Sequence, residues 1–342
     1  MDMEELVMQK LKDGGREAQI EAASELAKLG NKQRHKLVER GVIAPLVSML
    51  QYGDPEAIEA ALFALLSLTF GSERNKIRLA KSGAIPVLLQ LLRWPNKHLN
   101  ELVIAALLIL SSCKANKLAI ASSGAITMLL GILSRVCSFE HDQGDTNSIS
   151  SQAKADVIST LHNLSTCQQN ILPLVSSGVV PTLLQLSHGE DKSSELVEKA
   201  LALLESILMS SEDALSLAAD TDGSIRSLVE AVEEGSPQCK EHAAGILLLM
   251  CQSGRDKYRG LILKEGVVPG LLQLTVDGTW RAKDAAQELL LLLRDCPSYG
   301  GCRQSNYEFL EQLMEEIDAD DDRVIGTTTL QMVEQMIARL NT

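Results

Sequence analysis

The residues of this chain that are able to do covalent chemistry are scattered, without the spacing of a catalytic or metal site. Its six histidines and seven cysteines are spread along 342 residues, and no two cysteines form a Cys-x-x-Cys pair. A zinc site needs closely spaced pairs of ligands, and the sequence has no GxSxG, no HExxH and no phosphate-binding glycine loop. We therefore predict a protein that is not an enzyme, with reduced thiols, no metal, no cofactor and no small-molecule substrate.

Side chains suited to holding another polypeptide do recur at regular intervals. Three sets of aligned positions repeat with steps of 42 or 43 residues, apart from one step of 54. Their charged, polar and aromatic members are Glu59, Phe63, Ser67, Glu101, Ser159, Asn163, Glu198, Ser206, Glu241 and Gln287. We predict that these residues line a partner-binding groove, because positions four residues apart share one face of a helix.

Two of these sets have an alternative explanation. The four glutamates are expected to form a row that attracts a basic peptide or helix, or to lie at helix N-termini that favour carboxylates through the helix dipole. The Asn163 amide is expected to hold the backbone of a bound peptide, or to cap a local backbone group. The sequence alone leaves both alternatives open.

The helices that would position these residues follow from an internal repeat. Glycine followed by small or branched apolar residues and a leucine-rich run occurs six times, at Gly41, Gly83, Gly124, Gly178, Gly223 and Gly266. Each unit predicts three helices: a short one that ends at the glycine in left-handed geometry, a second that tolerates Pro in its first turn, and a third that is mostly apolar. A helix that is apolar nearly all round has to be covered by neighbours, so the units must stack.

This pattern resembles the armadillo repeat over residues 15–295. The resemblance implies an all-α fold, an armadillo-repeat right-handed superhelical solenoid (α-α superhelix), in preference to HEAT repeats, which have two helices per unit. Aromatic residues make up only 3% of the chain and hydrophobic residues 45%, which suits a core of leucine, isoleucine, valine and alanine.

Within that family, the armadillo regions of plant U-box proteins are the most similar. The resemblance rests on the phrases at 83–89, 162–165 and 278–286 (Gly-Ala-Ile-Pro-Val-Leu-Leu, His-Asn-Leu-Ser and Gly-Thr-Trp-Arg-Ala-Lys-Asp-Ala-Ala). It implies an array that recruits substrates or signalling partners. The U-box itself, which would recruit the conjugating enzyme, is not expected, because the first armadillo-like helix begins near residue 16.

The domain organisation follows from where the repeat is complete. Residues 1–30 are predicted to form N-terminal helices of an incomplete first repeat, and residues 31–295 the armadillo array. The polar stretch 138–151 accounts for the long step and is predicted to be an inserted loop, tolerated or functional. Residues 296–342 are predicted to be a helical cap or a partner-binding tail.

Composition narrows the class of partner. A net charge of −13 disfavours binding to nucleic acid, whose backbone is also negative. No apolar run reaches the length of a membrane span. The acidic N-terminus is unlike a signal peptide, which predicts a cytoplasmic or nuclear protein. We predict a protein-protein interaction adaptor or scaffold in plant signalling or ubiquitin-linked regulation. Its partner is expected to be a protein or peptide, and a basic one if the carboxylates of the glutamate row are available to bind it. The alternatives are a substrate-recognition partner of a ubiquitin ligase and a nuclear-import cargo receptor; the second lacks the Trp–Asn ladder of import adaptors, because only Asn163 is kept.

Overall fold

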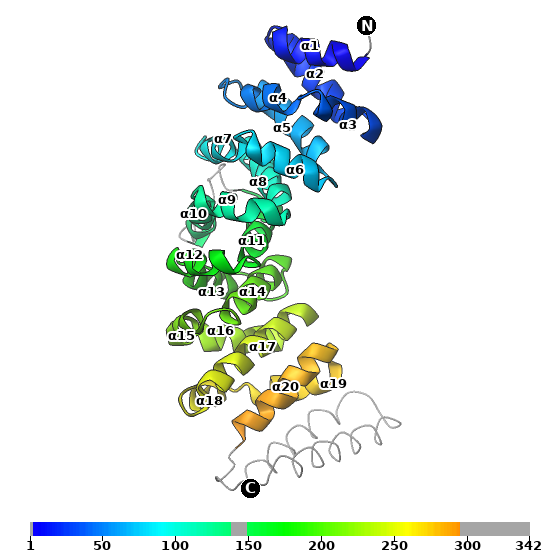
Figure 1. The fold of residues 1–342 in the computed structure, drawn as a ribbon. Coiled ribbons are helices and arrows are strands. Elements are labelled where there is room, and N and C mark those ends of the chain that lie inside the picture. The colour runs from blue at the N-terminus through cyan, green and yellow to red at the C-terminus, as the bar shows by residue number, and fades with distance from the viewer. Residues whose placement is uncertain (1–2, 138–148, 295–342) are drawn as a thin grey trace, which may run out of the picture. The chain divides into compact units, whose positions relative to one another are not determined.

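The computed structural model describes residues 3–137 and 149–294, which divide into two compact units at residue 214 (Figure 1). The described residues form α-helices and two short 3-10 helices, with no strand among them. The predicted three-helix repeat is confirmed in both units.

The third helices are the longest helix of most repeats. In the first unit they are α2 (Arg16–Lys28), α5 (Pro55–Thr69), α8 (Lys97–Ser111), α11 (Ser151–Ser165) and α14 (Glu195–Leu208); in the second unit they are α17 (Pro237–Ser253) and α20 (Trp280–Leu293). Within each unit, each third helix packs against the next one in this order. Their inward side chains, including Leu62, Leu107 and Leu161, are fully buried, which is why the apolar third helices must stack.

Most of the other helices pack against this layer. The first helices are α3 (Asn31–Glu39), α6 (Glu73–Lys81), α9 (Lys117–Ser122) after η1 (Lys114–Asn116), α12 (Ile171–Ser176) after η2 (Gln168–Asn170), α15 (Glu212–Asp220) and α18 (Arg255–Lys264). The second helices are α4 (Ile43–Met49), α7 (Ala84–Leu91), α10 (Ala125–Cys137), α13 (Val179–Gly189), α16 (Ser224–Glu234) and α19 (Val268–Asp277). The N-terminal helix α1 (Met3–Asp13) packs against α2 and α3.

Local sequence fixes where these helices end. All six repeat glycines have φ between +75° and +86°, the left-handed geometry predicted for them, which side chains with a Cβ adopt only with strain. Most third helices begin at a residue whose side-chain oxygen accepts a backbone N–H of the first turn. Those N-cap residues are Asp54, Asn96, Ser150, Ser194, Ser236 and Thr279.

The predicted domain boundaries fall partly outside the described residues. The inserted loop was predicted over 138–151, but α11 already begins at Ser151, because Ser150 caps it. Residues 138–148 and the predicted C-terminal cap at 296–342 lie outside the described residues. Among the described residues, no single helix is both long and apolar enough to span a membrane. Two pairs of successive helices reach that length and apolar character only when the two helices of a pair are taken together, and the pairs are bent by 108° and 69°.

Candidate protein-binding face

The predicted groove residues share one surface of the third helices. Except for Phe63, all of them are half-buried, and the Phe63 side chain is more open, with 43% of its surface exposed. We call this surface the third-helix face. In the first unit it is formed by Glu59, Phe63, Ser67, Glu101, Ser159, Asn163, Glu198 and Ser206, and in the second unit by Glu241 and Gln287. That these residues line a binding groove remains a prediction.

Three of the four carboxylates of the glutamate row have partners in the following repeat. The Glu59 Oε1 atom lies 3.1 Å from His98 Nε2, in the first turn of α8. Glu101 accepts the backbone N–H of Ser150 at 2.8 Å, at the start of α11. Glu241 accepts the Thr279 hydroxyl, which caps α20. In each case the carboxylate meets the positive N-terminal end of the next third helix.

Glu241 has a second partner, because its Oε1 atom lies 2.9 Å from the Arg281 guanidinium. Only 14% of the Glu241 side chain is exposed, against 47% of that of Arg281. These carboxylates therefore join consecutive repeats. They sit at a helix N-terminus, as the alternative hypothesis expected, but the N-terminus belongs to the neighbouring third helix.

The amide and hydroxyl groups of the third-helix face also bond across repeats. Asn163 donates from Nδ2 to the Ser111 hydroxyl of α8 at 3.0 Å. Ser67 donates to the Ala27 carbonyl of α2 at 3.2 Å. The Asn163 amide thus meets a side chain of the preceding third helix, 52 residues earlier in the sequence, rather than a local backbone group.

Small and apolar residues fill the remainder of the third-helix face. At the register of Phe63, the first unit carries Ala105 and Ala202 and the second unit carries Gly245, and all three are half-buried. Such residues leave the helix surface accessible to a bound chain and offer it apolar contact. The geometry therefore suits recognition by shape and apolar contact around Phe63, beside polar groups whose bonds hold the repeats together.

Sequence reasoning missed a second set of amides. Asn75, Asn116 and Asn170 are buried, and each donates to the C-terminal turn of the preceding third helix, at Leu68, Leu110 and Leu164 respectively. Asn116 also donates to the Lys76 carbonyl of the previous first helix at 3.1 Å. The signal was in the sequence, because each asparagine lies eight residues before a repeat glycine.

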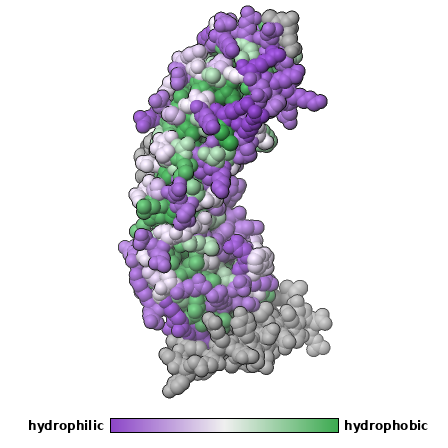
Figure 2. Space-filling view, viewed as in Figure 1, coloured by the Kyte–Doolittle hydropathy of each residue, from purple (hydrophilic) through white to green (hydrophobic). Residues whose placement is uncertain are grey.

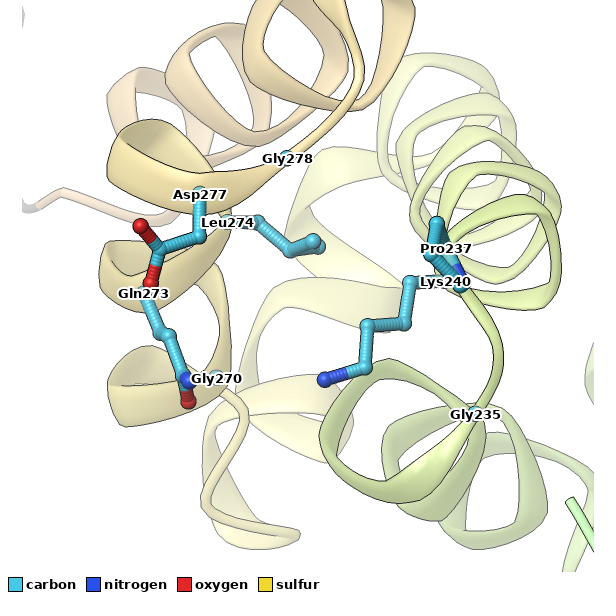
Figure 3. Close-up of a pocket in the computed structure, with 8 residues that line it drawn as sticks. All are labelled: Gly235, Pro237, Lys240, Gly270, Gln273, Leu274, Asp277 and Gly278. Carbon is cyan, nitrogen blue, oxygen red and sulfur yellow. The ribbon is translucent and has the colours of Figure 1, made fainter. Parts of the chain in front are cut away.

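A cavity of about 180 Å³ lies in the second unit, beside the turn between α16 and α17 (Figure 3). It is lined by Gly235, Pro237, Lys240, Gly270, Gln273, Leu274, Asp277 and Gly278. The Lys240 ammonium points into the cavity from one wall, and Gln273 and Asp277 lie on the opposite wall. One wall thus carries an ammonium group and the other a carboxylate.

Within 3–137 and 149–294, no three His, Cys, Asp or Glu side chains come together as a metal site. Burial raises the pKa of the Cys113 and Cys251 thiols, which keeps them protonated and poorly nucleophilic.

Comparison with known proteins agrees with the fold. Residues 126–311 match the family model described as the plant U-box protein ARM repeat region. U-box domain-containing protein 45 of Arabidopsis thaliana is 28% identical over 280 residues, which cover 81% of this chain and 34% of that protein. U-box domain-containing protein 4 of Oryza sativa subsp. japonica is 30% identical over 333 residues, 95% of this chain and 42% of that protein. The chain thus spans less than half the length of these relatives.

Solved structures show the same architecture. An engineered protein covers 99% of this chain and 78% of its own, with a TM-score of 0.71 and 21% identity. Computationally designed armadillo repeat proteins for modular peptide recognition match 85% of this chain and 99% of theirs, with a TM-score of 0.52 and 18% identity. The chain is an all-α armadillo solenoid, and its fold and relatives together support a protein-interaction scaffold.

Proposed function

Because the chain belongs to the plant U-box protein ARM repeat region family, we propose that it binds an extended segment of another protein along the third-helix face. The observation that carries this proposal is the common orientation of the aligned residues. On successive third helices the same registers stay half-exposed while the opposite sides are buried. Within each unit, the stacked helices thereby present a strip on which binding needs no movement of the backbone.

The nature of the bound protein depends on which polar groups of this strip are already engaged by other residues of the chain. Glu59, Glu101 and Glu241 are engaged by the next repeat. A designed armadillo repeat protein of the same fold was solved with the peptide (KR)4. In this chain, we propose, binding depends on apolar contact with Phe63 and with the small residues beside it. A basic partner gains less binding energy from these glutamates than it would gain from a row of unengaged carboxylates.

The cellular role is proposed from the relatives. Their names carry the U-box domain, so the scaffold is proposed to present a bound protein in ubiquitin-linked regulation or plant signalling, in the cytoplasm or nucleus, without itself being an enzyme. A nuclear-import receptor is the alternative function. Pull-down with a basic import peptide separates the two, because only the import receptor is expected to retain it.

The decisive experiment is affinity purification with quantitative mass spectrometry, using the full chain and two matched variants. Phe63→Ala removes the exposed aromatic ring of the third-helix face. Tyr52→Ala removes a ring that is 55% exposed in the turn between α4 and α5. We expect Phe63→Ala to lose its specific partners at least about tenfold, as loss of an anchoring aromatic does, and Tyr52→Ala to keep them.

The controls make the result interpretable. Both variants should melt at the temperature of the wild-type chain, because both side chains project from the surface. Retention of every partner by Phe63→Ala, or the same loss in both variants, contradicts binding along the third-helix face.

A further inference from the structure

Positive charge is concentrated on the first helices of the first three full repeats, although the chain as a whole is acidic. Residues 31–40, 73–81 and 114–122 contain ten Lys or Arg and two Glu, a surplus of eight, in a chain of net charge −13. The neighbouring second helices α4 and α7 have no charged residue. The acidic side chains therefore lie elsewhere, and this surface has an excess of cations.

The cations are aligned by helical spacing. Lys32, Lys36 and Arg40 follow each other at intervals of four along α3 and its C-cap. Arg74, Arg78 and Lys81 lie at intervals of four and three along α6. Residues with these spacings share one side of a helix. We call the seven residues Lys32, Lys36, Arg40, Arg74, Arg78, Lys81 and Lys114 the basic first-helix face.

The carboxylates on this face are outnumbered. Glu39 lies 2.9 Å from Arg78 and 3.6 Å from Arg74, so one carboxylate serves two guanidiniums and ties α3 to α6. Glu4, whose side chain is 5% exposed, lies 3.0 Å from Lys36 and 4.0 Å from Arg40. Each of these two carboxylates is shared between two cations, and Glu73 pairs with Lys76 at 2.6 Å, so the seven cations of the face outnumber the carboxylates that meet them.

The cations that remain are accessible and rigidly spaced. The side chains of Lys36 and Arg74 are 61% and 67% exposed, and Lys32, Lys81 and Lys114 are also exposed. The Asn116 amide joins η1 to the Lys76 carbonyl of α6, which fixes the spacing between two of the three helices. Over α3 and α6 the molecular surface is mostly hydrophilic (Figure 2), so an apolar partner is not favoured there.

We propose that the basic first-helix face binds an acidic, extended segment of a partner protein. Guanidiniums and ammoniums bind carboxylates directly, and opposite potentials steer such partners together. A narrow peptide meets only this face. A membrane or a nucleic acid presents negative charge over a wide area, which the acidic remainder of the chain repels. The face is separate from the third-helix face, so it provides a second binding surface.

The proposal is tested by fluorescence anisotropy with the full chain and a labelled twelve-residue Glu-Gly alternating peptide, with the Gln-Gly peptide as neutral probe. The triple variant Lys32→Glu, Lys81→Glu, Lys114→Glu reverses three cations that form no ion pair within residues 3–137 and 149–294. The control triple Lys240→Glu, Lys264→Glu, Lys283→Glu makes the same change of charge in the second unit.

We expect the wild-type chain to bind the Glu-Gly peptide and not the Gln-Gly peptide. The first triple variant should bind at least about tenfold more weakly, and the control triple within about twofold of wild type. An increase of NaCl from 50 to 300 mM should weaken binding at least about fivefold, because exposed charges are screened.

Three outcomes overturn the proposal. The first is no binding of the Glu-Gly peptide at 50 mM NaCl, and the second is an equal loss in both triple variants, which would reflect net charge alone. The third is that vesicles with phosphatidylserine bind the wild-type chain through these three lysines while the peptide does not, which would assign the face to anionic lipid.

Discussion

The third-helix face and the basic first-helix face of the first unit use charged residues in different ways. On the third-helix face, Glu59 and Glu101 each find a partner at the start of the next third helix. On the basic first-helix face, Glu39 is shared by two arginines. Charge on the first surface joins repeats, and charge on the second remains available. A row of charged residues in a repeat protein therefore indicates a binding surface only after its internal partners are known.

The largest expected effect concerns the buried amides that hold the repeats beneath both faces. Asn116→Ala removes two buried hydrogen bonds, to the Lys76 and Leu110 carbonyls, while the Leu110 carbonyl keeps the N–H of Cys113. Because a hydrogen bond within a protein contributes about 0.5–1.5 kcal/mol net, we expect the free energy of unfolding to fall by about 1–3 kcal/mol in urea denaturation followed by circular dichroism.

The matched control is the half-buried amide of the third-helix face. Asn163→Ala removes one bond, to Ser111, at a site that water reaches, so we expect a loss of about 0.5–1 kcal/mol. Equal losses in the two variants would mean that burial does not distinguish the two sets of amides.

A smaller effect is expected when a carboxylate that joins two repeats is removed. Glu101→Ala leaves the Ser150 N–H at the start of α11 without its acceptor, and the loss of a helix N-terminal acceptor typically costs about 1 kcal/mol. The control Asp284→Ala removes an exposed carboxylate in the second unit and should change stability by less than about 0.5 kcal/mol. If Glu101→Ala is as mild as its control, the glutamate row does not join the repeats.

The smallest effect concerns the shared carboxylate of the basic first-helix face. The hydrogen bond from Arg78, helped by Arg74, lowers the pKa of Glu39 below its ordinary value of 4.5. A lowered carboxyl pKa adds stability that is present above pH 4.5 and is lost as the pH falls through the folded-state pKa. Carboxyl-carbon NMR titration of the wild type and of Arg78→Gln should show the Glu39 pKa rising toward 4.5 in the variant. An unchanged value would show that Arg78 does not hold this carboxylate.

Much of the fold was predictable from the residues because its determinants are local. The repeat glycines adopt the left-handed geometry that their position before the second helix requires. The first armadillo-like helix, expected to begin near residue 16, is α2, which begins at Arg16. The sequence also identified which residues share the half-exposed side of the third helices, because helical periodicity sets this.

The use of those residues could not be predicted in the same way. Glu59 was expected either to face a partner or to lie at a helix N-terminus, and it lies against His98, 39 residues later. Asn163 meets Ser111, 52 residues earlier. The contacts depend on how far one third helix is rotated and shifted against the next, which the packing of buried leucines decides.

The sequence by itself determined the repeat, the three helices of each unit, the glycine and N-cap positions that end them, and the face on which each third-helix residue lies. All of these follow from interactions within about one helical turn. Only the tertiary structure decided which polar groups are engaged between repeats and which cations are left in excess. Those outcomes depend on atoms some 40 residues apart in the sequence, brought together by the stacking of apolar helices.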